Sequence, residues 1–224
     1  MTQVHVVRHD NSQLYAAQLD QYFRRRYDVF VRERGWTDIE RPDGRDIDQF
    51  DTEDAIHLLA IDKDEVVGGL RFNPSSGPTL LNDVYPHLCF GPLSRSPDIH
   101  ETTRLWVVKE RRSEVLQPSV EALLVAASLE LSIALGVRKT RVLFETRRLG
   151  RNKRLGWTLE PLGPPHEIDG ADFIAVERTS PRRSGPASAG SFPSPARSWS
   201  GTARRSPPTG FANWFRQWRE TTIK

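Results

Sequence analysis

The sequence predicts an α/β fold, a three-layer α-β-α sandwich in which helices cover both faces of a mixed β-sheet. Strand-like apolar runs alternate with helix-like stretches along the first 179 residues. A sheet buries apolar side chains on its faces, and helices that alternate with strands along the chain cover those faces. No internal repeat interrupts the alternation.

The start of the chain predicts an edge strand followed by a long helix. A short β-branched run over residues 4–7 is typical of an edge strand. Asn11 or Ser12 can cap a helix that continues to about Val31, because its apolar residues fall three to five positions apart. Gly35 ends this helix.

A polar loop over residues 37–53 follows, with a turn signal at Pro42-Asp43-Gly44. Beyond it, Lys63-Asp64 joins two strands as a hairpin. Gly68-Gly69 in the second of them indicates a bulge or a close backbone approach. Strands are expected over residues 55–62, 65–72, 103–108, 138–146, 157–162 and 172–178.

Two further helices are predicted in the second half of the chain. Residues 118–135 give the clearest helical pattern, with Pro118 in the first turn, a long apolar face and Gly136 as the stop. Residues 147–155 predict a short basic helix.

Charge is distributed unevenly and divides the chain into two parts. The chain has 32 Lys and Arg against 29 Asp and Glu, but eight of the bases and one of the acids lie from Ser180 onward. Residues 1–179 therefore carry a net charge of about −4, which argues against a nucleic-acid-binding protein. We expect one domain over residues 1–179. The basic Ser/Pro/Arg-rich tail over residues 180–224 has a composition typical of disorder or of unselected sequence.

Composition also bears on the cellular compartment. The single cysteine, Cys89, cannot form a disulfide within the chain, which fits the reducing cytoplasm. No basic segment followed by an apolar run marks a secretory signal near the start. The longest apolar stretch, residues 122–135, contains polar residues and is too short to span a bilayer. A cytoplasmic protein without a membrane partner is the prediction.

Eight residues in the first half stand out because they combine aromatic rings with charges of both signs. They follow the pattern Arg-x3-Phe-x5-Trp, Asp-x2-Asp, Arg and Glu-x2-Arg, at Arg26, Phe30, Trp36, Asp48, Asp51, Arg71, Glu101 and Arg104. Packing, turn formation or an exposed ion pair explains each residue taken alone. Together they suit a pocket for a zwitterionic, partly cationic, aromatic small molecule.

In these residues the chain resembles the acyl-homoserine-lactone synthases, the autoinducer synthases of bacterial quorum sensing. All eight identities of that family's signature are present in order, and the resemblance covers about residues 5–178. It implies a fold similar to that of the N-acetyltransferases and an enzyme that joins an acyl thioester to S-adenosylmethionine. The methionine amine attacks the thioester carbonyl to form an amide. The methionine carboxylate then closes the lactone and expels methylthioadenosine.

The residue types suit S-adenosylmethionine, which carries a carboxylate, an ammonium, a sulfonium and an adenine. Trp36 and Phe30 can supply an aromatic wall, where a sulfonium over an indole gains cation–π attraction. Asp48 and Asp51 can hold the ammonium. Three guanidiniums can bind the carboxylate or organise the acids through bidentate hydrogen bonds, those of Arg26, Arg71 and Arg104.

The attacking amine must be neutral, so the reaction needs a general base. Glu101 is the first candidate, directly or through a water molecule, and Asp48 is the second. Arg71 and Arg104 complete the expected catalytic set. No residue is expected to act as a covalent nucleophile, and Cys89 lies outside the signature. No metal or cofactor is expected besides the two substrates.

The acyl half of the site is expected from the second half of the chain. Ordinary core packing is the alternative for most of its candidates, Leu105, Val107, Leu123, Ala126, Ala127, Leu143 and Phe144. In many relatives that accept 3-oxo acyl chains, a threonine stands near the position of Val142. Because valine offers no hydroxyl to a 3-oxo group, we expect an unsubstituted, branched or aryl acyl chain.

The acyl donor is either acyl-acyl-carrier protein, which is strongly acidic, or acyl-coenzyme A. A basic cluster suits both donors, with a solvated face as the alternative, and consists of Arg147, Arg148, Arg151, Lys153 and Arg154. The stretches at residues 41–45 and 86–88 resemble the branch of the family that uses acyl-coenzyme A.

Two other classes of function are open from the sequence. A simple N-acetyltransferase would hold coenzyme A with an Arg/Gln-x2-Gly-x-Gly/Ala turn, whose nearest match, residues 147–152, fails at its last position. A non-enzymatic binding protein would use the basic tail, which has the charge but no recognisable nucleic-acid module.

Overall fold

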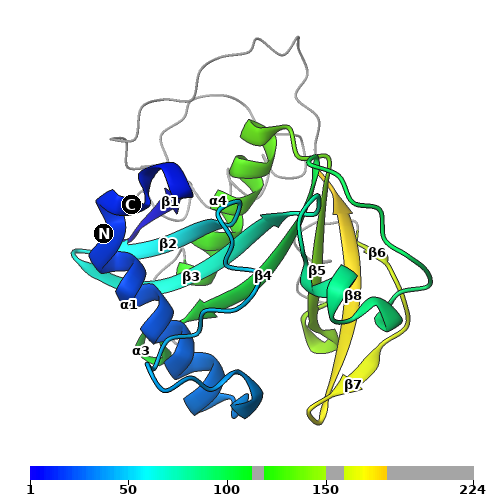
Figure 1. Cartoon of the computed structure of the whole chain (residues 1–224), viewed down its shortest axis with the longest axis horizontal. Coiled ribbons are helices and arrows are strands. Elements are labelled where there is room, and N and C mark those ends of the chain that lie inside the picture. Colours follow the sequence, from blue (N-terminus) through cyan, green and yellow to red (C-terminus); the bar gives the residue numbers. More distant parts are fainter. Residues whose placement is uncertain (113–118, 150–158, 181–224) are drawn as a thin grey trace, which may run out of the picture.

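The computed structural model describes residues 1–112, 119–149 and 159–180. Its strands form one sheet in the order β1-β2-β3-β4-β5-β8-β6, and β7 pairs with β8 (Figure 1). The strands are β1 (Gln3–Val7), β2 (Ile56–Asp62), β3 (Glu65–Pro74), β4 (Ile99–Val107), β5 (Lys139–Glu145), β6 (Glu160–Pro161), β7 (His166–Ile168) and β8 (Ala171–Thr179). Only β4 and β5 are parallel, so the sheet is mixed as predicted, with β1 at its edge.

Helices α1 (Ala16–Tyr27) and α4 (Val120–Leu135) cover opposite faces of this sheet (Figure 1). Adjacent residues of a strand point to opposite faces. A Cβ atom on Gly69 would overlap the ring of Tyr22 in α1, whereas a Cβ on Gly68 would lie 2.8 Å from Val120 in α4. The close approach predicted at these glycines is confirmed, and so is the three-layer sandwich.

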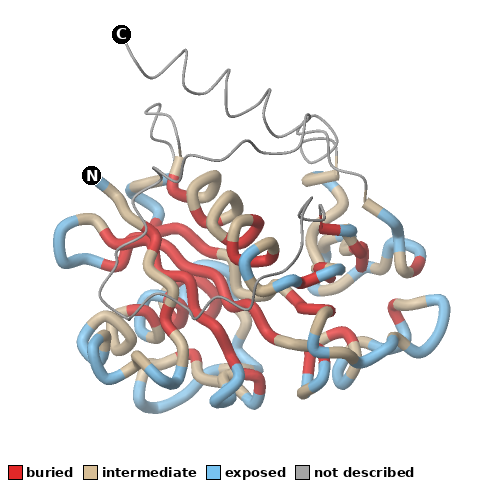
Figure 2. The backbone as a smooth tube through the Cα atoms, turned by 90° about the horizontal axis from the view of Figure 1, so that it is seen from above, coloured by how far each residue is buried: buried red, intermediate tan, exposed pale blue. Residues whose placement is uncertain are grey.

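The core lies along the central strands, as Figure 2 shows. Every residue of β2 except Asp62 is buried, which accounts for its nearly continuous apolar sequence. Within the described ranges, no helix is long and apolar enough to cross a membrane.

The first helical region is built from three pieces rather than one. A 3₁₀ segment over His9–Tyr15 precedes α1, and a π-helical segment over Asp28–Glu33 follows it. Asn11 and Ser12, the predicted caps, instead hydrogen-bond to Val6, Arg8 and His9 at the 3₁₀ segment. The predicted stop is confirmed, since Gly35 follows the π segment with a φ of +73°.

The later elements follow the prediction with several corrections. Ser119 caps α4 by accepting a hydrogen bond from the Ala122 amide, and Gly136 ends this helix with a φ of +70°. Strand β4 begins four residues earlier than predicted, so Glu101 lies within it. The prediction lacks α2 (Leu80–Asp83), α3 (Lys109–Arg112) and β7, because three or four residues show no hydrophobic period. The helix expected over residues 147–155 and the tail from residue 181 lie largely or wholly outside the described residues.

Strand β4 contains a bulge beside β3. Arg71 pairs with Thr103 and Gly69 pairs with Trp106, so two residues of β4, Arg104 and Leu105, lie opposite one residue of β3. Arg104 has a φ of +53°, a left-handed conformation that is rare for any residue other than glycine.

Candidate active site

Three arginines and three aspartates form a closed ring of ion pairs on the face of the sheet covered by α1. Around the ring each arginine pairs with two aspartates and each aspartate with two arginines, and Arg26 also lies 3.9 Å from Asp48 across the ring. In order around the ring, the members are Arg26, Asp46, Arg104, Asp48, Arg71 and Asp51. The nearest N–O distances are 2.9 to 3.0 Å for five of the contacts, and the Asp48–Arg71 pair completes the ring.

The arginines of the ring come from three different elements, and the aspartates come from one loop. Arg26 lies at the end of α1, Arg71 on β3 and Arg104 on β4. The aspartate loop is fixed by its own side chains, because Asp48 accepts a hydrogen bond from the Phe50 amide and Asp51 accepts one from the Asp48 amide. These hydrogen bonds orient both carboxylates relative to the loop backbone.

The bulge in β4 explains how Arg104 reaches this ring. Thr103 faces Arg71 and accepts a hydrogen bond from its Nε atom at 3.0 Å, so Thr103 points to the ring face. In a regular strand the next residue would point to the opposite face. The left-handed conformation at Arg104 turns its side chain back to Asp46 and Asp48.

Burial divides the ring into a fixed part and an accessible part. The side chains of Arg26, Asp46, Arg71 and Asp51 are at most 2% exposed, whereas those of Arg104 and Asp48 are 9% and 11% exposed. Burial alone would raise the pKa of Asp46 and Asp51, yet the neighbouring guanidiniums hold both pKa values below the ordinary range. Asp46 and Asp51 are therefore ionised, and the Asp48–Arg104 contact is the most exposed edge of the ring.

An aromatic pair lies against this edge. Phe30 and Trp36 stack with ring centroids 4.8 Å apart, and the Arg104 guanidinium lies 5.2 and 5.6 Å from the two centroids. The π-helical segment helps to set this geometry, since the Trp36 amide donates to the Phe30 carbonyl at 3.0 Å. Phe30 is buried and Trp36 is half-buried, so the indole is the aromatic surface available to a ligand.

Glu101 lies near the ring but outside it. Its carboxylate is bound by the backbone amides of Leu80 and Leu81, at 2.7 and 2.9 Å, where α2 begins. Burial raises the pKa of Glu101 to about 7, against these two amides and the charges of Arg71 and Arg141, which lower it. A carboxylate with a pKa near neutrality is suited to general-base chemistry.

The sequence signature lacks one member of the ring. Asp46 is 1% exposed and bridges Arg26 and Arg104, but it is one of several acids in a polar loop. His57 is also buried beside the ring, with its Nε2 atom 3.9 Å from Asp51. Burial lowers the pKa of His57 to about 3, so the imidazole is neutral and adds no charge.

The residues expected to meet the acyl carrier are only partly described. Arg147 pairs with Glu145 and is 76% exposed, and Arg148 lies 3.1 Å from Glu121. Arg151, Lys153 and Arg154 lie outside the described residues. Burial raises the pKa of the Cys89 thiol, which makes it a weak nucleophile.

The candidate acyl residues fall into two groups. Val107 belongs to the main core, and Leu105, Leu123 and Ala127 pack against it, as the packing alternative predicted. The remaining candidates, Ala126, Leu143 and Phe144, are half-buried. Pairing between β4 and β5 ends at Thr102 and Val142, so Val142 stands where the two strands begin to diverge.

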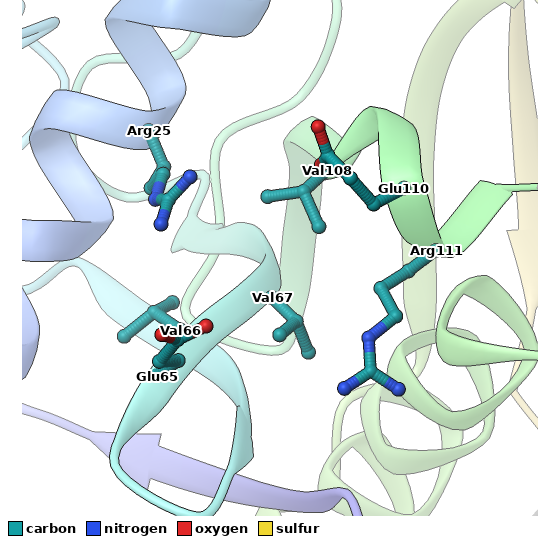
Figure 3. Close-up of a pocket in the computed structure, with 7 residues that line it drawn as sticks. All are labelled: Arg25, Glu65, Val66, Val67, Val108, Glu110 and Arg111. Carbon is teal, nitrogen blue, oxygen red and sulfur yellow. The ribbon is translucent and has the colours of Figure 1, made fainter.

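A surface pocket of about 240 Å³ lies away from the signature (Figure 3). Its lining comes from α1, β3 and the end of β4 with α3, and consists of Arg25, Glu65, Val66, Val67, Val108, Glu110 and Arg111. None of these is a signature residue, and the ring defines the candidate site.

Known proteins match both the sequence and the structure. A family model described as autoinducer synthase matches residues 10–182. The isovaleryl-homoserine lactone synthase of Bradyrhizobium diazoefficiens is 37% identical over 174 residues, which cover 77% of this chain and 78% of that protein. An acyl-homoserine-lactone synthase of Acinetobacter nosocomialis is 31% identical over 160 residues, or 67% of this chain and 85% of that protein.

Solved structures agree with the sequence matches. The CoA-dependent acyl-homoserine lactone synthase BjaI, in a complex with S-adenosylmethionine and isopentyl-CoA, has a TM-score of 0.76 at 34% identity, covering 81% of this chain and 84% of that one. A Lactobacillus plantarum protein named as an N-acetyltransferase has a TM-score of 0.54 at 17% identity, covering 80% and 98%, and shares the fold alone. The predicted N-acetyltransferase-like fold is confirmed.

Proposed function

This chain belongs to the autoinducer synthase family, and we propose that its ring of ion pairs and Glu101 divide the chemistry of acyl-homoserine-lactone synthesis between them. The enzyme makes an N-acyl-L-homoserine lactone from S-adenosylmethionine and an acyl thioester. The alternatives of a simple N-acetyltransferase and of a non-enzymatic binding protein are wrong, because the family match covers residues 10–182.

In the proposed arrangement, the methionine end of S-adenosylmethionine binds at the Asp48–Arg104 edge. These two side chains are the most exposed of the ring, and their contact joins one Arg104 Nη2 atom to one Asp48 oxygen at 2.9 Å. A ligand ammonium can replace the guanidinium on Asp48, while the ligand carboxylate binds Arg104. Trp36 then faces the sulfonium or the adenine.

The buried members of the ring act through their neighbours in this proposal. Arg26, Asp51 and Arg71 are at most 2% exposed, and ion pairs and hydrogen bonds to Thr103 and to the Asp48 amide occupy their polar atoms. They hold Asp48 and Arg104 in place when the exposed edge exchanges its partners. Asp46 does the same from the other side of Arg104.

Glu101 is the proposed general base. The bound ammonium transfers a proton to the Glu101 carboxylate, directly or through a water molecule, and the neutral amine attacks the thioester carbonyl carbon. The tetrahedral intermediate collapses to the amide, the C–S bond breaks, and the leaving thiolate takes up the second amine proton. The methionine carboxylate then attacks its own γ-carbon, closes the lactone and releases methylthioadenosine. Arg71 and Arg104 stabilise the carboxylates beside the reacting groups.

We propose acyl-coenzyme A as the donor, with a branched acyl chain. The support comes from the relatives, one named for its isovaleryl product and one described as CoA-dependent, and from the absence of a hydroxyl at Val142. Arg147 and Arg148 belong to the basic cluster proposed to meet the donor. We propose that synthesis takes place in the cytoplasm and involves no nucleic-acid or membrane partner.

Mass spectrometry of the reaction products tests this proposal. Purified enzyme with S-adenosylmethionine is given isovaleryl-CoA, straight-chain acyl-CoA, 3-oxo acyl-CoA and isovaleryl-acyl-carrier protein, and the homoserine-lactone fragment ion is measured. We expect isovaleryl-CoA to be the best donor and Glu101→Gln to lower kcat by about 10²-fold or more.

Glu130→Gln is the control, because burial raises the pKa of Glu130 as it does that of Glu101, but Glu130 is only half-buried and lies on α4. It should retain wild-type synthesis. A preference for 3-oxo or carrier-protein donors would contradict the proposed donor, and full activity of Glu101→Gln would contradict the proposed base.

A further inference from the structure

Strands β4, β5 and β8 are neighbours in the sheet (Figure 1), and a row of three charged residues crosses them. Glu101 stands in register with Arg141, and Arg141 with Glu177, so the three side chains lie on one face of the sheet. Arg141 and Glu177 are 3% and 6% exposed, and their Nε–Oε2 distance is 3.0 Å. The proposed chemistry uses Glu101 and assigns nothing to the other two.

Arg141 also holds a distant stretch of the chain. Its Nη1 atom donates to the Ser94 carbonyl at 2.8 Å, and its Nη2 atom donates to the Ser94 hydroxyl at 3.1 Å. One planar guanidinium therefore joins β8 to residues 93–95. A lysine could not make these three contacts from one rigid group.

Residues 93–95 in turn fix helix α2. The Asn82 side chain donates to the Leu93 carbonyl at 3.0 Å. Arg95 donates to the Asp83 carboxylate at 2.7 Å and to the Gly77 carbonyl at 2.8 Å. Because α2 has only four residues, it depends on such contacts for its position.

The first amides of α2 bind Glu101, so a continuous path of contacts runs from Arg141 through residues 93–95 and α2 to Glu101. From these contacts, we propose that Arg141 is a positioning residue for Glu101, acting through Ser94 and α2. The inference rests on the proposed role of Glu101 as the general base. Arg141 touches no substrate in this arrangement.

The direction of the effect follows from the groups that face Glu101. These are the two α2 amides, Arg71 from β3, Arg141 from β5 and the Cys89 thiol. If the α2 amides lose their hydrogen bonds to the carboxylate while it stays buried, its charged form is less favoured and its pKa rises. A general base acts when deprotonated, so the acid limb of the rate profile moves to higher pH.

The experiment compares three variants with the full-length enzyme. Asn82→Ala breaks the path without removing a charge. The double variant Arg141→Met/Glu177→Met removes the grip on Ser94 without leaving a buried acid unpaired. Lys139→Met is the control, because Lys139 also pairs with Glu177 but does not contact Ser94.

The readouts are kcat/KM for lactone synthesis as a function of pH, the KM for S-adenosylmethionine and the thermal unfolding midpoint. The first two variants should move the acid limb upward by about one pH unit, which is about a tenfold loss of activity on that limb. Their KM for S-adenosylmethionine should stay near the wild-type value, because the ring is intact. Lys139→Met should keep the wild-type profile.

Glu101→Gln separates the two proposals. If that variant keeps the wild-type acid limb, Glu101 is not the base and the proposed function fails at this point. If Glu101→Gln loses the acid limb of the kcat/KM profile while Asn82→Ala keeps that limb at the wild-type pH, the positioning role of Arg141 is overturned. A shift confined to the double variant, or an equal shift in Lys139→Met, overturns that role as well.

Discussion

At the scale of single residues, Arg104 joins backbone strain to site chemistry. A left-handed conformation costs a residue other than glycine about 1–3 kcal/mol, and such residues persist where their surroundings hold them. Asp46 and Asp48 hold Arg104 in this way, with N–O distances of 2.9 Å. The strained bulge is thus the means by which a strand residue reaches the ring.

Replacing Arg104 should therefore separate strain from charge. Arg104→Ala leaves the buried Asp46 and the partly exposed Asp48 short of a partner, and we expect it to lower the free energy of unfolding by about 3 kcal/mol and to abolish synthesis. Arg104→Gly should be equally inactive but more stable than Arg104→Ala by about 1 kcal/mol, because glycine adopts a positive φ without strain. Denaturant unfolding and the lactone assay measure both effects.

Arg24 in α1 provides the matched comparison. At this exposed helical position the order should reverse, with Arg24→Gly less stable than Arg24→Ala. If Arg104→Gly also proved less stable than Arg104→Ala, the strain argument would fail.

Glu101 should make stability depend on pH. Its folded-state pKa of about 7 exceeds the ordinary value of 4.5, so the folded state binds this proton more tightly than the unfolded state. The resulting stabilisation is complete below pH 4.5 and is lost as the pH rises through about 7. Relative to Glu101→Gln, the wild-type protein should lose up to about 3 kcal/mol of unfolding free energy over this range. A difference between the two proteins that is constant with pH would contradict this prediction.

At the scale of elements, the close packing of α1 on β3 depends on the absence of a side chain at Gly69. A methyl group there would overlap the Tyr22 ring. We expect Gly69→Ala to lower the free energy of unfolding by about 2 kcal/mol, and a second change of Tyr22→Leu to restore part of the loss. Gly77→Ala is the control, since its Cβ would find its nearest neighbour 3.9 Å away, and its effect should be small. Equal thermal midpoints for the two alanine variants would refute the packing argument.

Local sequence predicts an element well when a period or a terminal residue marks it. Helix α4 carries a long apolar face and ends at Gly136, and its observed bounds agree closely with the prediction. Asn11 and Ser12 have the right type for a cap, but a 3₁₀ segment uses their side chains instead. The π-helical segment is not predicted, because over six residues its wider spacing cannot be told apart from the scatter of apolar positions in an α-helix.

At the scale of the whole molecule, the site is a product of tertiary structure. The signature names five of the six ring members, but Asp46 becomes distinct only when the β4 bulge turns Arg104 toward it. Likewise, Glu101 is recognisable as a carboxylate from sequence, whereas its raised pKa depends on burial and on the α2 amides. The sequence pattern identifies the residues of the site, and the tertiary packing determines which of them form ion pairs and hydrogen bonds with one another.

The division of the chain at residue 180 leads to a further prediction. The ring and Glu101 come from residues 26–104, and β8 ends at Thr179. We expect a protein of residues 1–180 to keep the thermal midpoint and the lactone synthesis of the full chain. Its isoelectric point should become acidic, because residues 1–179 carry about −4. Loss of synthesis on truncation would assign the tail a part in the enzyme.

The closed ring also constrains how this enzyme can evolve. Every member has at least two partners, so a substitution that removes the charge of one member leaves its partners short of an ion pair, and a second, compensating substitution is needed to restore the balance. The six positions are therefore expected to change together rather than one at a time. Val142 carries no charge and needs no ion-pair partner, so it can change by single substitutions. In the proposed arrangement, single substitutions near Val142 can therefore change the acyl specificity, whereas the ring proposed to bind the methionine end of S-adenosylmethionine should vary little.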